Sequence, residues 1–287
     1  MKLRHVGRRS RRGLTLADLL VVVVLIPLLL AVVVGCYQRT RCGGSNRVKC
    51  ASNLRQIGQA LLIYSNDARG PYPRTVYALG SVVTPTWGTG AGAPNPFKEG
   101  GPAPNDVTAA LYLLLRTQDI TSEVFTCPSS QQERWDFGGG ANTAMNWSNW
   151  NGDAGIKKHL SYSLANPYAD DGAVERKYIW TNSLGAEFAL AADMNPGAGK
   201  DGTPGVLAVT STSSARDMKS ANSRNHEGDG QNVLYGDGHV EFQASPFCGV
   251  ARDNIYARRK SGAGPLVSDL IVGSPYDAAD SVLLPTD

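Results

Sequence analysis

Two histidines and three aspartates in the second half of the chain could bind a metal ion or transfer protons: His226, His239, Asp193, Asp229 and Asp237. Calcium needs about six to eight oxygen atoms that converge on one point, and residues 193–197 begin like a calcium-binding loop. The loop pattern fails at Pro204, because an EF-hand has a bidentate glutamate at that position. Calcium bound by Asp193, Asp229 or Asp237 is therefore an alternative hypothesis. We expect no resident cofactor, and we expect these residues to form turns and to cap backbone groups.

The sequence contains no motif of a known catalytic site. It lacks the Gly-x-Ser-x-Gly, Ser-x-x-Lys and His-Glu-x-x-His patterns. Gly199-Lys200-Asp201 lacks the glycine spacing and the Ser or Thr of a phosphate-binding loop. We therefore expect no enzymatic activity. A surface hydrolase with a Ser-His-Asp triad assembled from distant residues is the alternative.

The chain has five cysteines, which is an odd number: Cys36, Cys42, Cys50, Cys127 and Cys248. In an exported chain, at least one of them must be free, lipidated or paired with another molecule. Cys36 borders an apolar segment, so pairing among the other four is open, and we favour Cys50 with Cys127. No two cysteines have the Cys-x-x-Cys spacing of a zinc or redox site.

A basic block and an apolar segment occupy the start of the chain. Residues 1–13 contain six lysines and arginines and no acid, whereas residues 14–35 carry a single charge. As a helix, 22 residues at about 1.5 Å per residue cover roughly 33 Å, enough to cross a hydrocarbon core of about 30 Å. We therefore predict a transmembrane segment at 14–35, with the basic block in the cytoplasm and the rest of the chain outside it.

Asp18 is the single charge within this apolar segment. A carboxylate at the centre of a membrane span costs about 2.5–3.5 kcal/mol, so it is expected to have a cationic partner. Cleavage after Gly13 would create a new amino group on Leu14, four residues from Asp18. The amine of one subunit could then pair with the carboxylate of a neighbour. An uncleaved anchor would leave Asp18 unexplained.

The segment Arg12-Gly13-Leu14-Thr15-Leu16-Ala17-Asp18 resembles the processing site of type IV prepilins and type II secretion pseudopilins. The resemblance implies that prepilin peptidase cleaves after Gly13 and that Leu14 is then N-methylated. It also implies that Asp18 supports assembly with other pseudopilin subunits through the N-terminal helix, in the bacterial inner membrane, with a periplasmic head. The family usually has Phe in place of Leu14 and Glu in place of Asp18.

Three other interpretations of the N-terminal segment stay open. Residues 10–14 loosely match a twin-arginine export signal, although the apolar run is longer than such signals need. Val33-Val34-Gly35-Cys36 matches a lipoprotein cleavage site, which would make Cys36 a lipidated N-terminus. The third interpretation is the uncleaved anchor.

The helical period returns after a possible break at Cys42-Gly43-Gly44. One apolar stripe has spacings of three or four: Val48, Ala51, Leu54, Ile57, Leu61 and Tyr64. We therefore predict an N-terminal helix over 14–66, whose second half packs on a globular head formed by residues 67–287. Residues 50–61 also resemble the helix that follows the anchor in a large subfamily of bacterial pseudopilin-like proteins.

The head is predicted to be mostly β-structure. We expect a helix from Asn105 or Asp106 to Gln118, short strands at 125–130, 160–164 and 187–193, and a hairpin at 231–243. The Asp237-Gly238 pair favours a type I′ turn in that hairpin. With His226, this pair resembles the C-terminal prepilin-associated motif His-x9-Asp-Gly. Ten residues separate His226 from Asp237, so we expect the extra residue in the loop at 228–230. The predicted fold class is α+β and pilin-like, with a long helix on a mostly antiparallel sheet.

Charge and aromatic residues limit the class of partner. The net charge is +3, but residues 1–13 carry +6, so a chain cleaved after Gly13 would carry 3 − 6 = −3. We therefore expect no nucleic-acid binding. Three tryptophans at 135, 147 and 150 lie among Asn and Gly and could stack on a sugar. A membrane-tethered glycan-binding module is therefore the alternative to a filament subunit.

Overall fold

The computed structural model describes residues 16–81, 104–135, 158–199 and 205–287. The side chains of Asp18 and of residues 30–43 lie outside this description. The chain divides into two compact units, Met1–Gly44 and Ser45–Asp287. The second unit combines helices with a mostly antiparallel sheet, so the α+β class expected from the sequence is confirmed.

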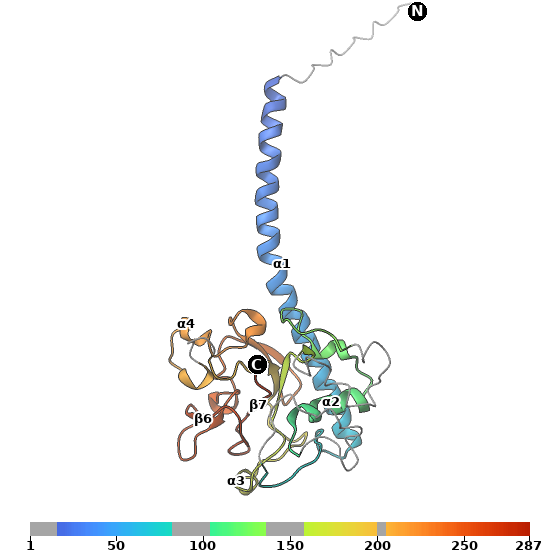
Figure 1. The fold of residues 1–287 in the computed structure, drawn as a ribbon, viewed down its shortest axis with the longest axis vertical. Coiled ribbons are helices and arrows are strands. Elements are labelled where there is room, and N and C mark those ends of the chain that lie inside the picture. Colours follow the sequence, from blue (N-terminus) through green and yellow to red (C-terminus); the bar gives the residue numbers. More distant parts are fainter. Residues whose placement is uncertain (1–15, 82–103, 136–157, 200–204) are drawn as a thin grey trace, which may run out of the picture. The chain divides into compact units, whose positions relative to one another are not determined.

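Helix α1 is the longest element and covers Leu16–Asp67 (Figure 1). It continues through residues 42–44, so the predicted break there is wrong. A glycine inside a helix costs only about 1 kcal/mol relative to alanine, which the neighbouring turns can offset. Among the residues that the structure describes, no helix has both the length and the apolar character that crossing a membrane would require.

The C-terminal part of α1 belongs to the core of the second unit. Leu54, Ile57 and Leu61 are fully buried, as the predicted stripe requires. Val48 is 68 % exposed, so its assignment to the stripe is wrong. The buried face starts instead at Cys50, whose spacing to Leu54 continues the same side of the helix.

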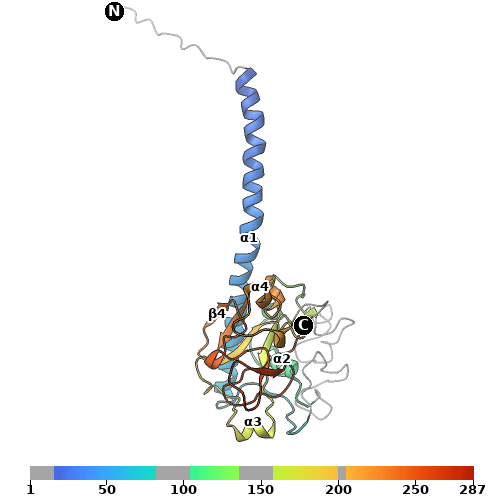
Figure 2. The same ribbon diagram turned by 90° about the vertical axis from the view of Figure 1, so that its left-hand side faces the viewer.

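A five-stranded antiparallel sheet forms the centre of the head (Figures 1 and 2). Its strand order is β4-β3-β2-β1-β7. The strands cover Val240–Gln243, Gln231–Tyr235, Ala189–Asp193, Tyr162–Ala165 and Leu283–Leu284 in that order. Every residue of β1, β2, β3 and β7 is buried, including the polar residues Ser163, Asp193, Gln231 and Asn232. Strand β2 has the central place that the sequence predicts.

Strand β7 completes the edge of the sheet beside β1. Leu164 pairs with Leu284, and Ala165 pairs with Leu283. The side chain of Asn195 donates to the backbone oxygen of Leu283 at 2.8 Å, which also ties β7 to the segment that follows β2.

Several shorter elements surround the sheet. Helix α2, Val107–Thr117, begins with Asp106 as its N-cap, close to the predicted bounds. The predicted strand at 125–130 is wrong: the 3₁₀ helix η1, Ser122–Phe125, is followed by a turn. The remaining elements are α3 (Asp171–Glu175), η4 (Val206–Ala208), α4 (Ala215–Met218), η5 (Arg224–His226), η6 (Val250–Arg252), β5 (Arg258–Arg259) and β6 (Ser268–Leu270).

The hairpin β3–β4 forms where the sequence predicts it, but its turn differs. Gly238 has a φ of +87°, whereas Gly236 and Asp237 do not have positive φ. The backbone nitrogen of Gly238 donates to Tyr235, and the backbone nitrogen of Tyr235 donates to His239. A three-residue loop with a left-handed last residue therefore replaces the predicted type I′ turn, because Gly236 lengthens the connection.

Candidate functional site

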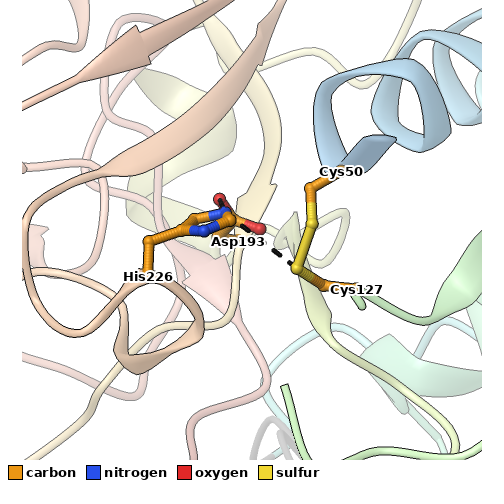
Figure 3. Close-up of side chains that lie close together, drawn as sticks. All are labelled: Cys50, Cys127, Asp193 and His226. Carbon is orange, nitrogen blue, oxygen red and sulfur yellow. Dashed lines mark hydrogen bonds and ion pairs between the residues drawn. A yellow bond between two sulfur atoms is a disulfide. The ribbon is translucent and has the colours of Figure 1, made fainter. Parts of the chain in front are cut away.

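Four side chains from different parts of the chain converge beside the sheet: Cys50, Cys127, Asp193 and His226 (Figure 3). Their nitrogen, oxygen and sulfur atoms all lie within 4.8 Å of one another. All four residues are buried, and the exposed fraction is highest for His226, at 5 %. Helix α1 carries the first residue, the turn after η1 the second, the end of β2 the third and the end of η5 the fourth.

Cys50 and Cys127 form a disulfide, and this is the pair that the sequence favours. The bond links α1 to the turn after η1, across 77 residues of sequence. That turn is fixed by Ser130, whose backbone nitrogen and hydroxyl group both donate to the backbone oxygen of Cys127. Together with the buried face of α1, the disulfide attaches this helix to the head.

Asp193 is a fully buried carboxylate with several hydrogen-bond donors around it. Its Oδ1 accepts from the side chain of Asn225 at 3.1 Å. Its Oδ2 accepts from the backbone nitrogen of Asn232 at 2.7 Å and from the side chain of the same residue at 3.1 Å. These donors offset much of the cost of removing a carboxylate from water, because buried charges are tolerated when they are hydrogen-bonded.

His226 lies between this carboxylate and the disulfide. Its Nε2 is 3.1 Å from Oδ2 of Asp193 and 3.9 Å from Sγ of Cys127. The same Nε2 is 3.2 Å from the side-chain nitrogen of Asn232. It can therefore donate to Asp193 in one ring tautomer or accept from Asn232 in the other. The ring of Phe242 packs edge-on against the imidazole, with 5.9 Å between ring centroids.

The backbone around His226 accounts for its position. Ser223 caps η5 by accepting from the backbone nitrogen of Asn225, and Glu227 ends the helix with a left-handed φ of +59°. The chain then turns back into β3, since the backbone nitrogen of Asp229 donates to His226 at 3.0 Å. Because β3 pairs with β2, this turn places His226 beside Asp193.

A cavity of about 260 Å³ lies near the cluster, but none of the four residues lines it. Its lining includes Met194 and Asn225, the sequence neighbours of Asp193 and His226, together with Ser130 and Arg224.

The three aspartates of the calcium hypothesis do not come together. Asp229 is paired with the ammonium group of Lys219 at 2.6 Å and with Arg47 at 3.5 Å, and the hydrogen bond from Lys219 lowers the pKa of this carboxyl group. Asp237 lies in the hairpin loop, where hydrogen bonds from the backbone and ring of His239 lower its pKa. Among the described residues, the one group of three or more His, Cys, Asp or Glu side chains that could hold a metal ion contains Asp193 but neither Asp229 nor Asp237. Calcium at one of these aspartates stays a hypothesis.

The two ends of the His226–Asp237–Gly238 motif have separate places. His226 belongs to the buried cluster, whereas Asp237 and Gly238 shape the hairpin loop. Strand β3 connects them, and its residue Asn232 donates to Asp193.

Other residues singled out in the sequence have different outcomes. Gly13 and Leu14 lie outside the described residues, as does the side chain of Asp18. Trp147 and Trp150 also lie outside them, and Trp135 is 5 % exposed with its ring against His159. Trp135 therefore does not offer an open ring face for a sugar.

The convergence of cysteines, aspartate and histidine was not predicted from the sequence. One signal could have indicated it. Asp193 ends a predicted central strand, and His226 precedes a predicted hairpin strand by a few residues. If these two strands are neighbours in an antiparallel sheet, the two side chains meet at the same end of that sheet.

Comparison with known proteins gives no match: no protein-family model, curated protein or solved structure matches this chain. Its function is therefore argued from its own residues.

Proposed function

We propose that this chain is a pseudopilin-like subunit of a type II secretion or type IV pilus-like filament. In this proposal, prepilin peptidase cleaves between Gly13 and Leu14, and the mature subunit is anchored in the bacterial inner membrane by residues 14–35. The head lies on the periplasmic side. The role is mechanical and not catalytic, because growth of the filament supplies displacement and the head supplies contacts with partners.

The observation that carries the proposal is the exposure of apolar side chains along the first part of α1. All described residues from 16 to 29 are exposed, and they are almost entirely Leu, Val and Ile. Leu16 is 82 % exposed and Leu20 is 63 % exposed. A helix that is apolar on all sides is stable only when lipid or other protein covers it. Lipid before assembly and the helices of other subunits after assembly would both provide that cover.

The head end of the same helix supports this arrangement. Leu54, Ile57 and Leu61 are buried in the head, and Cys50 adds a covalent link. A filament subunit needs such an attachment, because force along the filament must reach the head without pulling the helix out of it. Asp18 has a partner in this proposal, since the new amine of Leu14 on a neighbouring subunit can neutralise it.

The test is the N-terminus of the protein in its native membrane. Gly13→Ala is expected to retain residues 1–13, whereas wild type loses them, as intact mass shows. Gly7→Ala is the matched control, because it changes another glycine of the same basic block and is expected to be trimmed normally. Normal trimming of Gly13→Ala contradicts the proposal.

The same spectrum separates the competing interpretations. A wild-type chain that begins at Met1 indicates an uncleaved anchor, and one that begins at an acylated Cys36 indicates a lipoprotein. Either result overturns the proposed processing. For assembly, Asp18→Asn is expected to abolish filament formation by overproduced subunits, while Asp18→Glu retains it because it keeps the charge.

A further inference from the structure

The Cys50–Cys127 disulfide lies among polar side chains, Asp193 and His226, that a disulfide does not need as neighbours. A disulfide is a neutral, mostly apolar group that can pack against hydrocarbon side chains. Here an imidazole and a carboxylate, each almost without solvent contact, lie directly against it. Burying such a pair costs free energy, because both groups lose their contact with water.

Two thiolates, an imidazole nitrogen and a carboxylate oxygen are the ligand types that zinc uses in tetrahedral sites. With typical zinc–ligand bonds, neighbouring ligand atoms in such a site are roughly 3.3–3.8 Å apart. In this structure Sγ of Cys127 is 3.9 Å from Nε2 of His226, which in turn is 3.1 Å from Oδ2 of Asp193. The two sulfurs are bonded to each other in this structure, and reduction would let them separate into two ligands.

We propose that, when the Cys50–Cys127 disulfide is reduced, these two cysteines with Asp193 and His226 bind one divalent transition-metal ion of the zinc class. The disulfide and the metal are then alternative links between α1 and the head. In the oxidised chain the sulfurs are bonded to each other and the site takes no metal.

The disulfide is first reduced, and the metal ion then binds. A dithiol reductant gives two electrons and two protons, the sulfur–sulfur bond breaks, and the reductant becomes a disulfide. The metal then binds both sulfurs as thiolates and displaces one proton from each thiol. His226 binds through Nε2 as the neutral ring, in the tautomer that carries its hydrogen on Nδ1. Asp193 exchanges its contact with His226 for the metal and keeps the hydrogen bonds from Asn225 and Asn232.

The nearby cavity is lined by Met194 and Asn225, which adjoin Asp193 and His226 in sequence, but by none of the four ligands. Entry of the ion from this cavity would require these two side chains to move aside. The ligands come from four separate elements, so metal binding would stabilise the tertiary arrangement of the head and not one local loop.

The test uses the full chain in detergent, with Cys36, Cys42 and Cys248 each changed to Ser. After reduction, the thiols are then those of Cys50 and Cys127 alone. The dithiol reductant is removed without oxygen, and Co²⁺ is added as a spectroscopic probe. The reduced chain is expected to bind one Co²⁺, with a sulfur-to-cobalt charge-transfer band and the intense visible bands of a tetrahedral site. Zn²⁺ is expected to displace the cobalt, and the oxidised chain is expected to show neither band.

Two conservative variants test the other ligands. His226→Gln and Asp193→Asn are each expected to weaken cobalt binding by more than about tenfold, a loss that even residues outside the ligand shell can cause. The matched controls are His239→Gln and Asp237→Asn, which change an exposed histidine–aspartate pair and are expected to leave binding unchanged. All variants are purified oxidised, and near-ultraviolet circular dichroism verifies their fold before reduction.

A measurement without substitutions guards against misfolded variants. The reduced wild-type chain is alkylated with and without Zn²⁺, and modified cysteines are identified by mass spectrometry. Zn²⁺ is expected to protect Cys50 and Cys127 and to leave the alkylation of Cys248 unchanged. Equal alkylation with and without Zn²⁺, no cobalt bands after reduction, or bands unaffected by both ligand variants would each overturn the proposal.

Discussion

A methyl group added at Gly58 of α1 would lie 2.8 Å from Cδ1 of Leu234 on β3. Helix α1 can therefore lie this close to the sheet only because residue 58 has no side chain. Packing of α1 against the sheet therefore positions this helix, in addition to the disulfide.

Gly58→Val is expected to lower the free energy of unfolding by about 1–3 kcal/mol, because the branched side chain must displace Leu234 in a packed core. Urea unfolding of the full chain in detergent, followed by near-ultraviolet circular dichroism, measures this change. Gly44→Ala is the control, since an added methyl group there meets no atom within 4 Å. Equal midpoints for the two variants would show that the close contact does not matter.

Removing the disulfide is expected to lower the free energy of unfolding by more than Gly58→Val does. The double variant Cys50→Ala, Cys127→Ala frees a loop of 77 residues, and chain-entropy estimates for such a loop give a loss of about 4 kcal/mol. The same urea experiment under oxidising conditions measures it. Cys248→Ala, at the half-buried free thiol, is expected to cost about 1 kcal/mol or less. A double variant as stable as Cys248→Ala would contradict the structural role of the bond.

Asp106 predicts how stability depends on pH. Its carboxyl group caps α2 through Ala109 and Thr108, but Oδ2 is buried with no hydrogen-bond partner among the described residues. Burial raises the pKa of this group from 3.8 to about 6. The folded chain therefore holds this proton more tightly than the unfolded chain, and protonation of Asp106 stabilises the fold. This stabilisation is complete below pH 3.8 and is lost as the pH rises through 6.

Asp106→Asn is therefore expected to flatten the pH profile of unfolding. The fall in stability between about pH 4 and pH 7 should shrink by about 3 kcal/mol, because two pKa units correspond to that free energy. Asparagine still caps the helix, so the fold is retained. Asp269→Asn, at an exposed position, is the control and should keep the wild-type slope. An unchanged slope in Asp106→Asn would show that this group is ionised in the folded chain.

The loop after His226 depends on Gly230. Its φ is +154°, and an added methyl group would lie 2.3 Å from the backbone oxygen of Gln243 on β4. Gly230→Ala is expected to destabilise the head by about 2 kcal/mol or more, because backbone atoms cannot move aside as a side chain can. Gly262→Ala is matched by its positive φ of +71° but has open space around it, so it should cost only about 1 kcal/mol. Thermal unfolding of both variants distinguishes steric contact from backbone strain.

Local patterns in the sequence predicted local structure well. Asp106 before an apolar period gave the N-terminus of α2, and the run that ends at Asp193 gave the central strand. The sequence predicted structure less well where contacts with distant parts of the chain decide the conformation. The apolar residues near Cys127 suggested a strand, but the turn fixed by Ser130 and the disulfide to α1 exclude one there.

The buried cluster was beyond these patterns for a physical reason. Its members are separated by long stretches of chain and meet only because β2 and β3 are neighbours and α1 crosses beside them. Val48 shows the same limit within one helix. Its spacing fits the apolar stripe, yet it is 68 % exposed, whereas Cys50 two residues later is buried.

The position of β7 has a consequence for how the protein is made. Within the described part of the chain, the edge of β1 that faces away from β2 pairs with β7, through Leu283 and Leu284. The ribosome synthesises these two residues long after β1. Until then, a partly translated or partly exported head presents unpaired backbone groups to other chains. A nonsense mutation shortly before codon 283 should therefore yield an aggregating polypeptide and not a shorter working one.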